Sequence, residues 1–86
     1  MRKRAYIAGP MRNYKHFNFP AFDEAAARAR SLRWEPISPA DMDREVGFDA
    51  TKETLEGFDL NAAIARDVAA IMGLDVKAGD AIAMLP

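Results

Sequence analysis

The stretch Ala5-Tyr6-Ile7-Ala8-Gly9-Pro10 decides the fold, because it is a short apolar run that stops at a turn dipeptide. It predicts a buried strand. A second run, Trp34–Ile37, ends at Ser38-Pro39, and Pro36 within it lacks a backbone donor, which indicates a strand at a sheet edge. A third run, Ala81–Leu85, is apolar without interruption, as is typical of a strand buried on both faces.

Two segments between these runs repeat apolar residues with the period of about 3.6 that marks an amphipathic helix. The first is Phe19–Leu32, with Asn18 as a suitable N-cap and Pro20 in the first turn. The second is Asp59–Met72, with Asp59 as the cap and Gly73 just after the end.

Strands and helices that alternate in this way predict an α/β fold. We expect a Rossmann-like or flavodoxin-like parallel sheet, with three strands in this chain and helices beside it. Ligands of such sheets bind beyond the carboxyl ends of the strands, which are here Gly9-Pro10, Ser38-Pro39 and Pro86. Residues 40–58 are acidic and weakly patterned, and predict only a helical turn that begins at Thr51.

Composition restricts the class of protein. The 86 residues are 50% hydrophobic and 29% charged, which fits one small globular domain over residues 1–86. The absence of cysteine excludes disulfides and thiolate metal sites, and the single histidine with scattered carboxylates predicts no metal site. We therefore expect a cytoplasmic protein without a cofactor, and no membrane partner, because no apolar run approaches the ~20 residues of a membrane span.

Charge is almost balanced, with 12 Lys and Arg against 13 Asp and Glu. Such a chain is not expected to bind nucleic acid non-specifically.

Asp67 does not fit a simple amphipathic helix. On a helical wheel with Leu60 at zero, Ile64 falls at about 40°, Ile71 at about 20° and Asp67 at about −20°. A carboxylate within an apolar stripe costs several kcal/mol unless it is paired or opens onto a polar pocket. Two interpretations remain open: Asp67 lines a pocket, or it is a paired buried acid. Arg66 lies too far round the wheel to be its obvious partner.

The segment Tyr6–Arg12 is the second unusual feature. Gly9 would let backbone N–H groups approach an anion, and Arg12 could clamp a phosphate or carboxylate. The simpler alternative is a strand followed by a turn. Nearby aromatic residues are expected to be mainly core, although one or two rings could stack on a nucleobase: Tyr14, Phe17, Phe19 and Phe22.

Taken together, several motifs resemble the nucleoside 2-deoxyribosyltransferase-like superfamily, and most closely a small branch found in phages and bacteria. The resemblance covers essentially the whole chain, in the right order. The motifs that carry it are Tyr6–Arg12, Phe17–Asp23, Trp34-Glu35, Ser38–Ala40, Arg66–Val68 and Asp80 leading into Leu85-Pro86.

This resemblance implies chemistry on N-glycosidic bonds. Members of the family transfer 2-deoxyribose between bases, or hydrolyse deoxynucleoside 5′-monophosphates to a base and deoxyribose 5-phosphate. A glutamate attacks the anomeric carbon and an aspartate helps to handle the leaving base, which parallels the retaining glycosidases. Family members commonly form dimers, so we expect a homo-oligomer that binds a small nucleoside or nucleotide.

The resemblance also implies roles for particular residues. Asp67 matches the family's helix aspartate near the base and sugar, which makes it the expected catalytic residue, and Arg12 matches the residue that meets a 5′-phosphate. Asp80 matches a structural acid. The expected substrate-binding loop consists of Tyr6, Gly9, Pro10 and Met11, and Ser38 and Asp41 follow the second strand as further possible contacts.

Departures from the family pattern bear directly on activity. The family's nucleophilic glutamate follows the third strand, and no glutamate of this chain occupies the matching position. We therefore expect the domain to be incomplete at its C-terminal end and this chain alone to be inactive. The alternative is a catalytically inactive nucleotide-binding, sensor or assembly module. Arg33 stands where the family usually has glycine, which predicts modest backbone strain.

Overall fold

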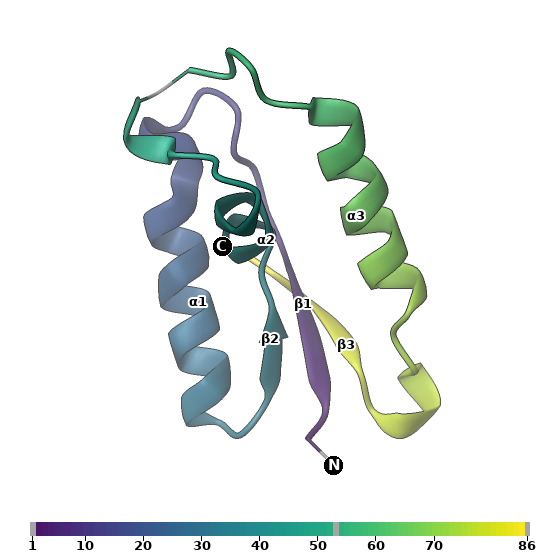
Figure 1. Ribbon diagram of the computed structural model, residues 1–86. Coiled ribbons are helices and arrows are strands. Elements are labelled where there is room, and N and C mark those ends of the chain that lie inside the picture. Colours follow the sequence, from purple (N-terminus) through teal and green to yellow (C-terminus); the bar gives the residue numbers. More distant parts are fainter. Residues whose placement is uncertain (1, 53, 86) are drawn as a thin grey trace.

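Three parallel strands form the sheet in the order β2-β1-β3, so that β1 is central (Figure 1). They are β1 (Arg4–Ala8), β2 (Glu35–Ile37) and β3 (Ala81–Met84). The structure, a computed structural model, describes residues 2–52 and 54–85. The predicted α/β fold with a parallel three-stranded sheet is confirmed, whereas Pro86, at one expected loop of the site, lies outside the described residues.

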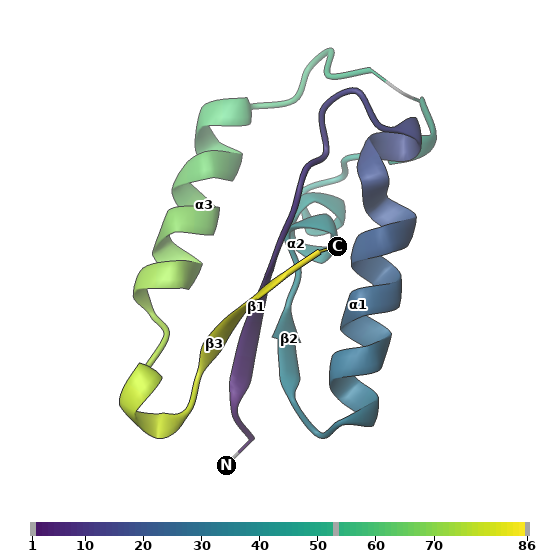
Figure 2. The same cartoon turned by 180° about the vertical axis from the view of Figure 1, so that it is seen from behind.

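Helices lie on both faces of the sheet. Figures 1 and 2 show α1 (Phe19–Ser31) on one side of the strands and α3 (Leu60–Met72) on the other. Successive side chains of β1 point to opposite faces. Ile7 packs against Phe19 and Phe22 on the α1 side, and Tyr6 therefore faces α3.

Both predicted helices are confirmed to within one residue at each end. At α3, Asp59 is the expected cap, because its Oδ1 accepts a hydrogen bond of 3.0 Å from the Ala62 N–H. Asn18 occupies the N-cap position of α1 but does not cap it. Its Nδ2 instead donates to the Pro10 carbonyl at 2.8 Å, and so ties the loop after β1 to the start of α1.

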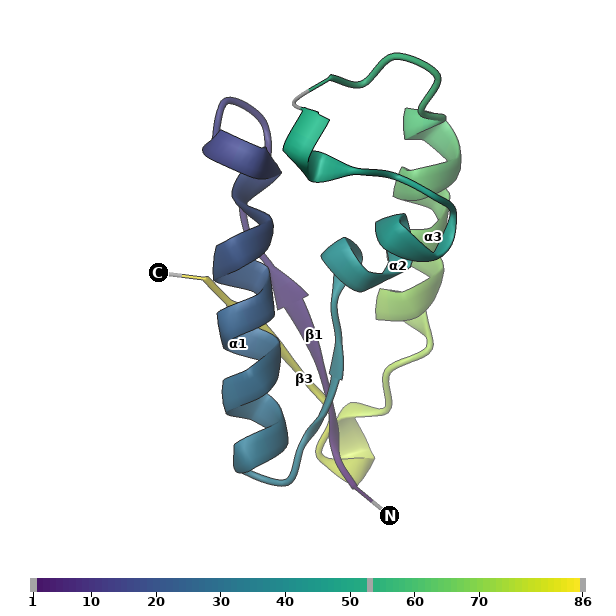
Figure 3. The same ribbon diagram turned by 60° about the vertical axis from the view of Figure 1, so that its left-hand side comes forward.

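Residues 40–58 contain more structure than the sequence predicts. The helix α2 (Pro39–Glu45) follows β2 directly, and Figure 3 shows it at the end of that strand, between α1 and α3. Ser38 is its N-cap residue and Pro39 its first residue, an ordinary combination at a helix start. A short 3-10 turn covers Ala50–Lys52, close to the predicted start at Thr51.

The prediction that Ala81–Leu85 is buried on both faces is wrong. β3 pairs with β1 as expected, but it is an edge strand, and Ile82 and Met84 are 49% and 73% exposed. Ile82 pairs with Tyr6 and Met84 with Ala8, so both side chains point to the α3 side of the sheet, and their exposure shows that α3 does not cover β3. The uninterrupted apolar run thus predicted the strand correctly, but not its place at the edge of the sheet.

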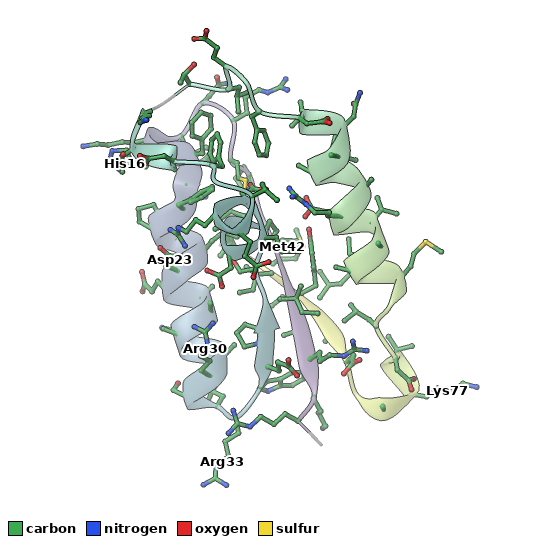
Figure 4. All side chains as sticks on the ribbon, in the orientation of Figure 1. His16, Asp23, Arg30, Arg33, Met42 and Lys77 are labelled. Atoms are coloured by element: carbon green, nitrogen blue, oxygen red, sulfur yellow. The ribbon has the colours of Figure 1, made fainter. Side chains whose placement is uncertain are left out.

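β2 is the other edge strand, as Pro36 predicted, and Pro36 pairs with Ala5. Arg33 has a φ of 65°, so the strain expected at this non-glycine position is confirmed, and its side chain extends beyond the end of α1 (Figure 4). Asp80 is structural, as expected. It accepts hydrogen bonds from the Arg4 N–H at 2.8 Å and the Asp75 N–H at 2.9 Å.

Candidate functional site

Four polar side chains from three elements meet on the α3 face of the sheet. Tyr6 comes from the buried centre of β1, Asp43 from α2, and Arg66 and Asp67 from α3. The side chains of Tyr6 and Asp67 interact with each other, and Arg66 Nη2 donates to Asp43 Oδ1 at 3.1 Å. These four residues are called the Tyr6 cluster below.

Burial dominates the electrostatics of the Tyr6 cluster. Asp43 is only 7% exposed, and burial together with the nearby negative charge of Asp67 raises its pKa to about 6, although Arg66 opposes this shift. Burial also raises the pKa of Asp67, against the hydrogen bond with Tyr6 and the charge of Arg66. The pKa of Tyr6 is raised by burial and by Asp67, which keeps the phenol protonated.

The arrangement suits proton transfer. Two carboxyl groups share one cation, and the second of them to ionise does so near neutral pH, so the pair can retain a proton there. An acid with a pKa close to the working pH is an efficient general acid. Arg66 Nε is also buried and has no partner among the described residues, so one donor of the cluster is unused.

Asp67 does turn inward, as the helical wheel suggested, but the wheel was wrong about its neighbours. Leu60, Ile64 and Ile71 are exposed, whereas the buried residue of α3 is Ala63. Asp67 lies at the edge of the exposed apolar stripe that contains Leu60, Ile64 and Ile71, and its side chain faces Tyr6. Its interaction with Tyr6 makes it a paired acid, and Arg66 pairs with Asp43 rather than with Asp67.

Gly9 is required by packing at the end of the sheet. A Cβ atom at Gly9 would lie 2.5 Å from Leu85 Cδ1, and the Leu85 N–H donates to the Ala8 carbonyl at 2.7 Å. Leu85 therefore occupies the space beside Gly9 that the sequence suggested for an anion. Met11 packs against the core, Pro10 is exposed, and its carbonyl is engaged by Asn18.

Arg12 lies on the exposed part of the same loop. Within residues 2–52 and 54–85 it has no hydrogen-bond or ion-pair partner, so its guanidinium is available to an anion. It is not part of the Tyr6 cluster.

The structure does not bring Ser38 and Asp41 to the Tyr6 cluster. Ser38 follows Ile37, which pairs with Tyr6, so strand alternation places its side chain on the face of Ile7. Its hydroxyl is buried and has no partner among the described residues. Asp41 is directed to the α1 side, with Arg44 Nη1 at 3.3 Å from its Oδ1.

The loop between β1 and α1 is strained. Four non-glycine residues in it have positive φ, and His16, Phe17 and Asn18 do so consecutively. Figure 4 shows His16 at this end of the molecule. Phe17 packs edge-on against Phe48, with ring centroids 5.3 Å apart. The aromatic residues of the loop region divide as follows: Phe19 and Phe22 are buried in the core, Phe17 is half-buried, and Tyr14 is exposed.

Sequence reasoning missed Asp43 because it missed α2. A helix that starts at Pro39 places Ala40 and Asp43 three residues apart, on one face. Ala40 is fully buried, so that face is the inner one. The signal that could have revealed it was Ser38-Pro39, which was interpreted as a turn but also fits an N-cap followed by the first residue of a helix.

An apolar groove lies on the opposite face of the sheet, between α1 and β3. Its volume is about 440 Å³, and we call it the α1–β3 groove. Its charged lining residues are Glu24 and Arg28, both exposed. Because no buried polar groups converge there, the candidate site is placed at the Tyr6 cluster. The apolar side chains that line the groove come from α1, β1 and β3 and include Ala25, Ala29, Leu32, Ala5, Ala81 and Ala83.

Comparison with models of protein families, with curated proteins and with solved structures gives no match. The resemblance to the deoxyribosyltransferase-like superfamily thus stays a prediction from the residues. Of the helices in the described part of the chain, none is long and apolar enough to cross a bilayer. Residues 2–52 and 54–85 also contain no group of three His, Cys, Asp or Glu side chains suited to a metal ion.

Proposed function

We propose that this domain acts on the N-glycosidic bond of a nucleoside or of a deoxynucleoside 5′-monophosphate, with the Tyr6 cluster beside the leaving base. Asp67 is the general acid, and Asp43 and Tyr6 set its protonation and orientation. The observation that carries the proposal is a pair of carboxyl groups of raised pKa, the buried Asp43 and the half-buried Asp67, next to Tyr6 of the central strand.

The chemistry follows from the properties of a nucleobase as a leaving group. A base that departs with the electrons of the C–N bond must be protonated, or hydrogen-bonded by an acid, as the bond breaks. The pKa of Asp43 and that of Asp67 are both raised, so the pair can hold the proton that Asp67 supplies to the base. Arg12, exposed on the loop after β1, is suited to a 5′-phosphate, which favours a phosphorylated substrate.

Attack on the anomeric carbon requires a separate nucleophile. No described glutamate contributes to the pKa shifts of Tyr6, Asp43 or Asp67. Glu24 borders the groove on the other face, and Glu45 and Glu56 are exposed. The proposal therefore assigns the described residues to substrate binding and to the leaving base, and leaves the nucleophile to a group outside the cluster.

The alternative function, a nucleotide-binding module without catalysis, is supported by the same lack of a nearby glutamate. Both functions place the nucleotide at the Tyr6 cluster. They differ only in whether free base is released.

Base release separates the two. The chain is incubated with deoxynucleosides and their 5′-monophosphates, free base is measured by chromatography, and binding is measured by calorimetry. If the domain is catalytic, Asp67→Asn should lower the rate of base release by about 100-fold or more, the usual contribution of a general acid.

The matched control is Asp59→Asn, which makes the same change on the same helix at an exposed N-cap, where asparagine caps as well as aspartate. It should retain the wild-type rate. Binding without base release, in a chain that intact-mass measurement on the native gene product confirms as full length, would establish the inactive module. Absence of both binding and base release would contradict both functions.

A further inference from the structure

We propose that the α1–β3 groove is a second binding site, which takes a fatty acid: a single alkyl chain with a carboxylate head. The alkyl chain lies in the groove, and the carboxylate lies among cations at the end where the strands begin. This inference is independent of the chemistry proposed above, because the groove and the Tyr6 cluster lie on opposite faces of the sheet.

The α1–β3 groove follows the axis of α1. Its lining extends along that helix from Ala21 to Leu32, a length of about 16 Å at a rise of about 1.5 Å per residue. Ala5 of β1 and Ala83 of β3 line it from the sheet. Ala83 pairs with Ile7, whose side chain lies on the α1 side, so Ala83 also points to that side.

The width of the groove fits one hydrocarbon chain. A volume of about 440 Å³ over a length of about 16 Å gives a mean cross-section of about 28 Å², or a width of about 6 Å. An α-helix with its side chains is about 10–12 Å across, so a docked helix would not enter the groove. An extended alkyl chain of roughly a dozen carbons has the matching length.

The groove opens into a pocket with basic walls where the strands begin. Leu32 and Trp34 line both cavities, so the two are continuous. The other described residues that line this second cavity, of about 540 Å³, are all cations: Arg2, Lys3 and Arg33. We call it the basic pocket. An apolar groove that ends at a group of cations is complementary to an alkyl chain that ends in an anion.

The cations of the basic pocket are available to a ligand. Arg2, Lys3 and Arg33 are exposed, and none of them has an ion-pair partner in the described part of the chain. The Lys3 ammonium group lies 5.8 Å from the centroid of the Trp34 ring, at the place where the apolar and basic linings meet. A carboxylate bound there would contact the cations while its alkyl chain lies against the indole.

The backbone of Arg33 supports a functional role for its charge. Its φ of 65° lies in the left-handed region, which favours glycine and is strained for arginine. The side chain extends beyond the end of α1 (Figure 4), and no ion pair with another described residue offsets the strain. Strain at an unpaired charged residue indicates a site for a ligand rather than a requirement of packing.

The charges along the groove fix the direction of the ligand. Arg28 lies in the last turns of α1, toward the basic pocket, and Glu24 lies one turn earlier, toward the other end. Glu24 is the only acid among the described residues that line the groove and the basic pocket. The carboxylate is therefore attracted to the end of the groove near Arg33 and repelled from the end near Glu24.

Fluorescence of Trp34 tests the proposal, because Trp34 is the only tryptophan of the chain and lines both cavities. The unaltered chain is titrated with dodecanoate below its critical micelle concentration. The emission should shift to shorter wavelength and saturate, because the alkyl chain displaces water from the indole. Dodecyltrimethylammonium, which has the same chain and a cationic head, should bind about 10-fold more weakly or less.

Brominated chains report the direction of binding, since bromine quenches indole fluorescence on contact. Dodecanoate with bromine next to the carboxylate should quench Trp34 more strongly than dodecanoate with bromine at its terminal carbon. Stronger quenching by the terminal bromine would overturn the proposal. This measurement needs no substitution, so it remains decisive if a variant does not fold.

A variant that fills the groove tests the place of the alkyl chain. Ala83→Phe adds a ring at an exposed position of β3 and should lower the affinity for dodecanoate by about 10-fold or more, because methylene groups excluded from the groove lose their burial. The matched control, Ala62→Phe at an exposed position of α3, should leave the affinity unchanged.

A variant without cations tests the place of the carboxylate. Lys3→Ala with Arg33→Ala should weaken dodecanoate binding by about 3–10-fold, the range expected for exposed ion pairs, and should leave the binding of dodecanol unchanged. The matched control is Lys15→Ala with Lys52→Ala, which removes two exposed cations that line neither cavity. It should bind both ligands as the unaltered chain does.

Three results would contradict the assignment. Absence of a saturable response to dodecanoate would overturn it, and so would a response that Ala83→Phe leaves unchanged. The third is binding to vesicles of phosphatidylcholine and phosphatidylglycerol, lost on Lys3→Ala with Arg33→Ala, by a chain that does not bind monomeric dodecanoate. That result would assign the basic pocket to a membrane surface instead.

Discussion

Asp43 sets the balance of charge in the Tyr6 cluster. It is almost fully buried and has Arg66 as its cation, while Asp67 from α3 and Tyr6 from β1 also face it. The next charged residue of α2, Arg44, turns away to Asp23 on α1. Burial of Asp43, and then the nearby charge of Asp67, make ionisation of Asp43 unfavourable, and the single guanidinium of Arg66 only partly offsets this, which is why the pKa of Asp43 rises.

Replacement of Asp43 should change how stability depends on pH. The pKa of Asp43 is about 6 in the folded chain and 3.8 without the fold's influence, so the folded state binds the proton more tightly. The proton on Asp43 stabilises the folded state fully at a pH below the pKa of Asp43 in the unfolded chain. This stabilisation is lost as the pH rises through the pKa of Asp43 in the folded chain. Between pH 4 and 6 the wild type should therefore lose up to about 3 kcal/mol relative to Asp43→Asn.

Urea denaturation at a series of pH values measures this difference. Asp41→Asn is the control, since Asp41 is a half-exposed residue of the same helix that is directed to α1, and its curve should run parallel to that of the wild type. A wild-type curve that also runs parallel to that of Asp43→Asn would show that Asp43 does not retain its proton in the folded chain.

At the level of single residues, the sequence revealed Asp67 but not Asp43. Asp67 interrupts the regular pattern of a long helix, and such an interruption is visible on a helical wheel. Asp43 lies on a helix of seven residues, which is too short for a periodic pattern to be recognised. The pairing of Arg66 with Asp43 joins residues 23 positions apart, and only the tertiary structure determines it.

At the level of elements, the ends of β1 and β3 depend on close contact at Gly9. Gly9→Ala would place a Cβ atom 2.5 Å from Leu85 Cδ1 and 2.8 Å from Leu85 Cβ. The resulting overlap should lower the free energy of unfolding by about 1–3 kcal/mol. Gly73→Ala is the control, because its nearest atom would be 3.4 Å away, and it should have little effect in the same denaturation experiment. Equal stability of the two variants would show that Leu85 does not pack on Gly9.

The type and order of the main helices and strands could be predicted from the sequence, but not which of their side chains are covered by neighbouring elements. Apolar runs and turn residues located all three strands, and periodicity located α1 and α3. Whether Ile82 and Met84 are covered depends on which helix reaches β3, and this is a property of the assembled layers. The exposure of Ile64 has the same cause. An apolar stripe on a helix predicts that the stripe is covered, but the sequence does not say whether the sheet of the same chain covers it.

At the level of the whole molecule, the two faces of the sheet have different characters. The α1 face holds the aromatic and aliphatic core, and the α3 face holds the Tyr6 cluster with exposed apolar residues of α3, such as Ile64 and Val68, beside it. The α3 face thus combines two carboxyl groups of raised pKa, Asp43 and Asp67, with the buried phenol of Tyr6.

The location of nucleotide binding tests the central claim most directly. An isotope-labelled sample is titrated with 2′-deoxynucleoside 5′-monophosphates, and changes in the amide signals are followed by NMR. The claim that the Tyr6 cluster is the site predicts the largest changes at Tyr6, Asp43, Asp67 and Arg12. Changes confined to the α1–β3 groove, at Ala25, Ala29 and Ala83, or no changes at all, would contradict it.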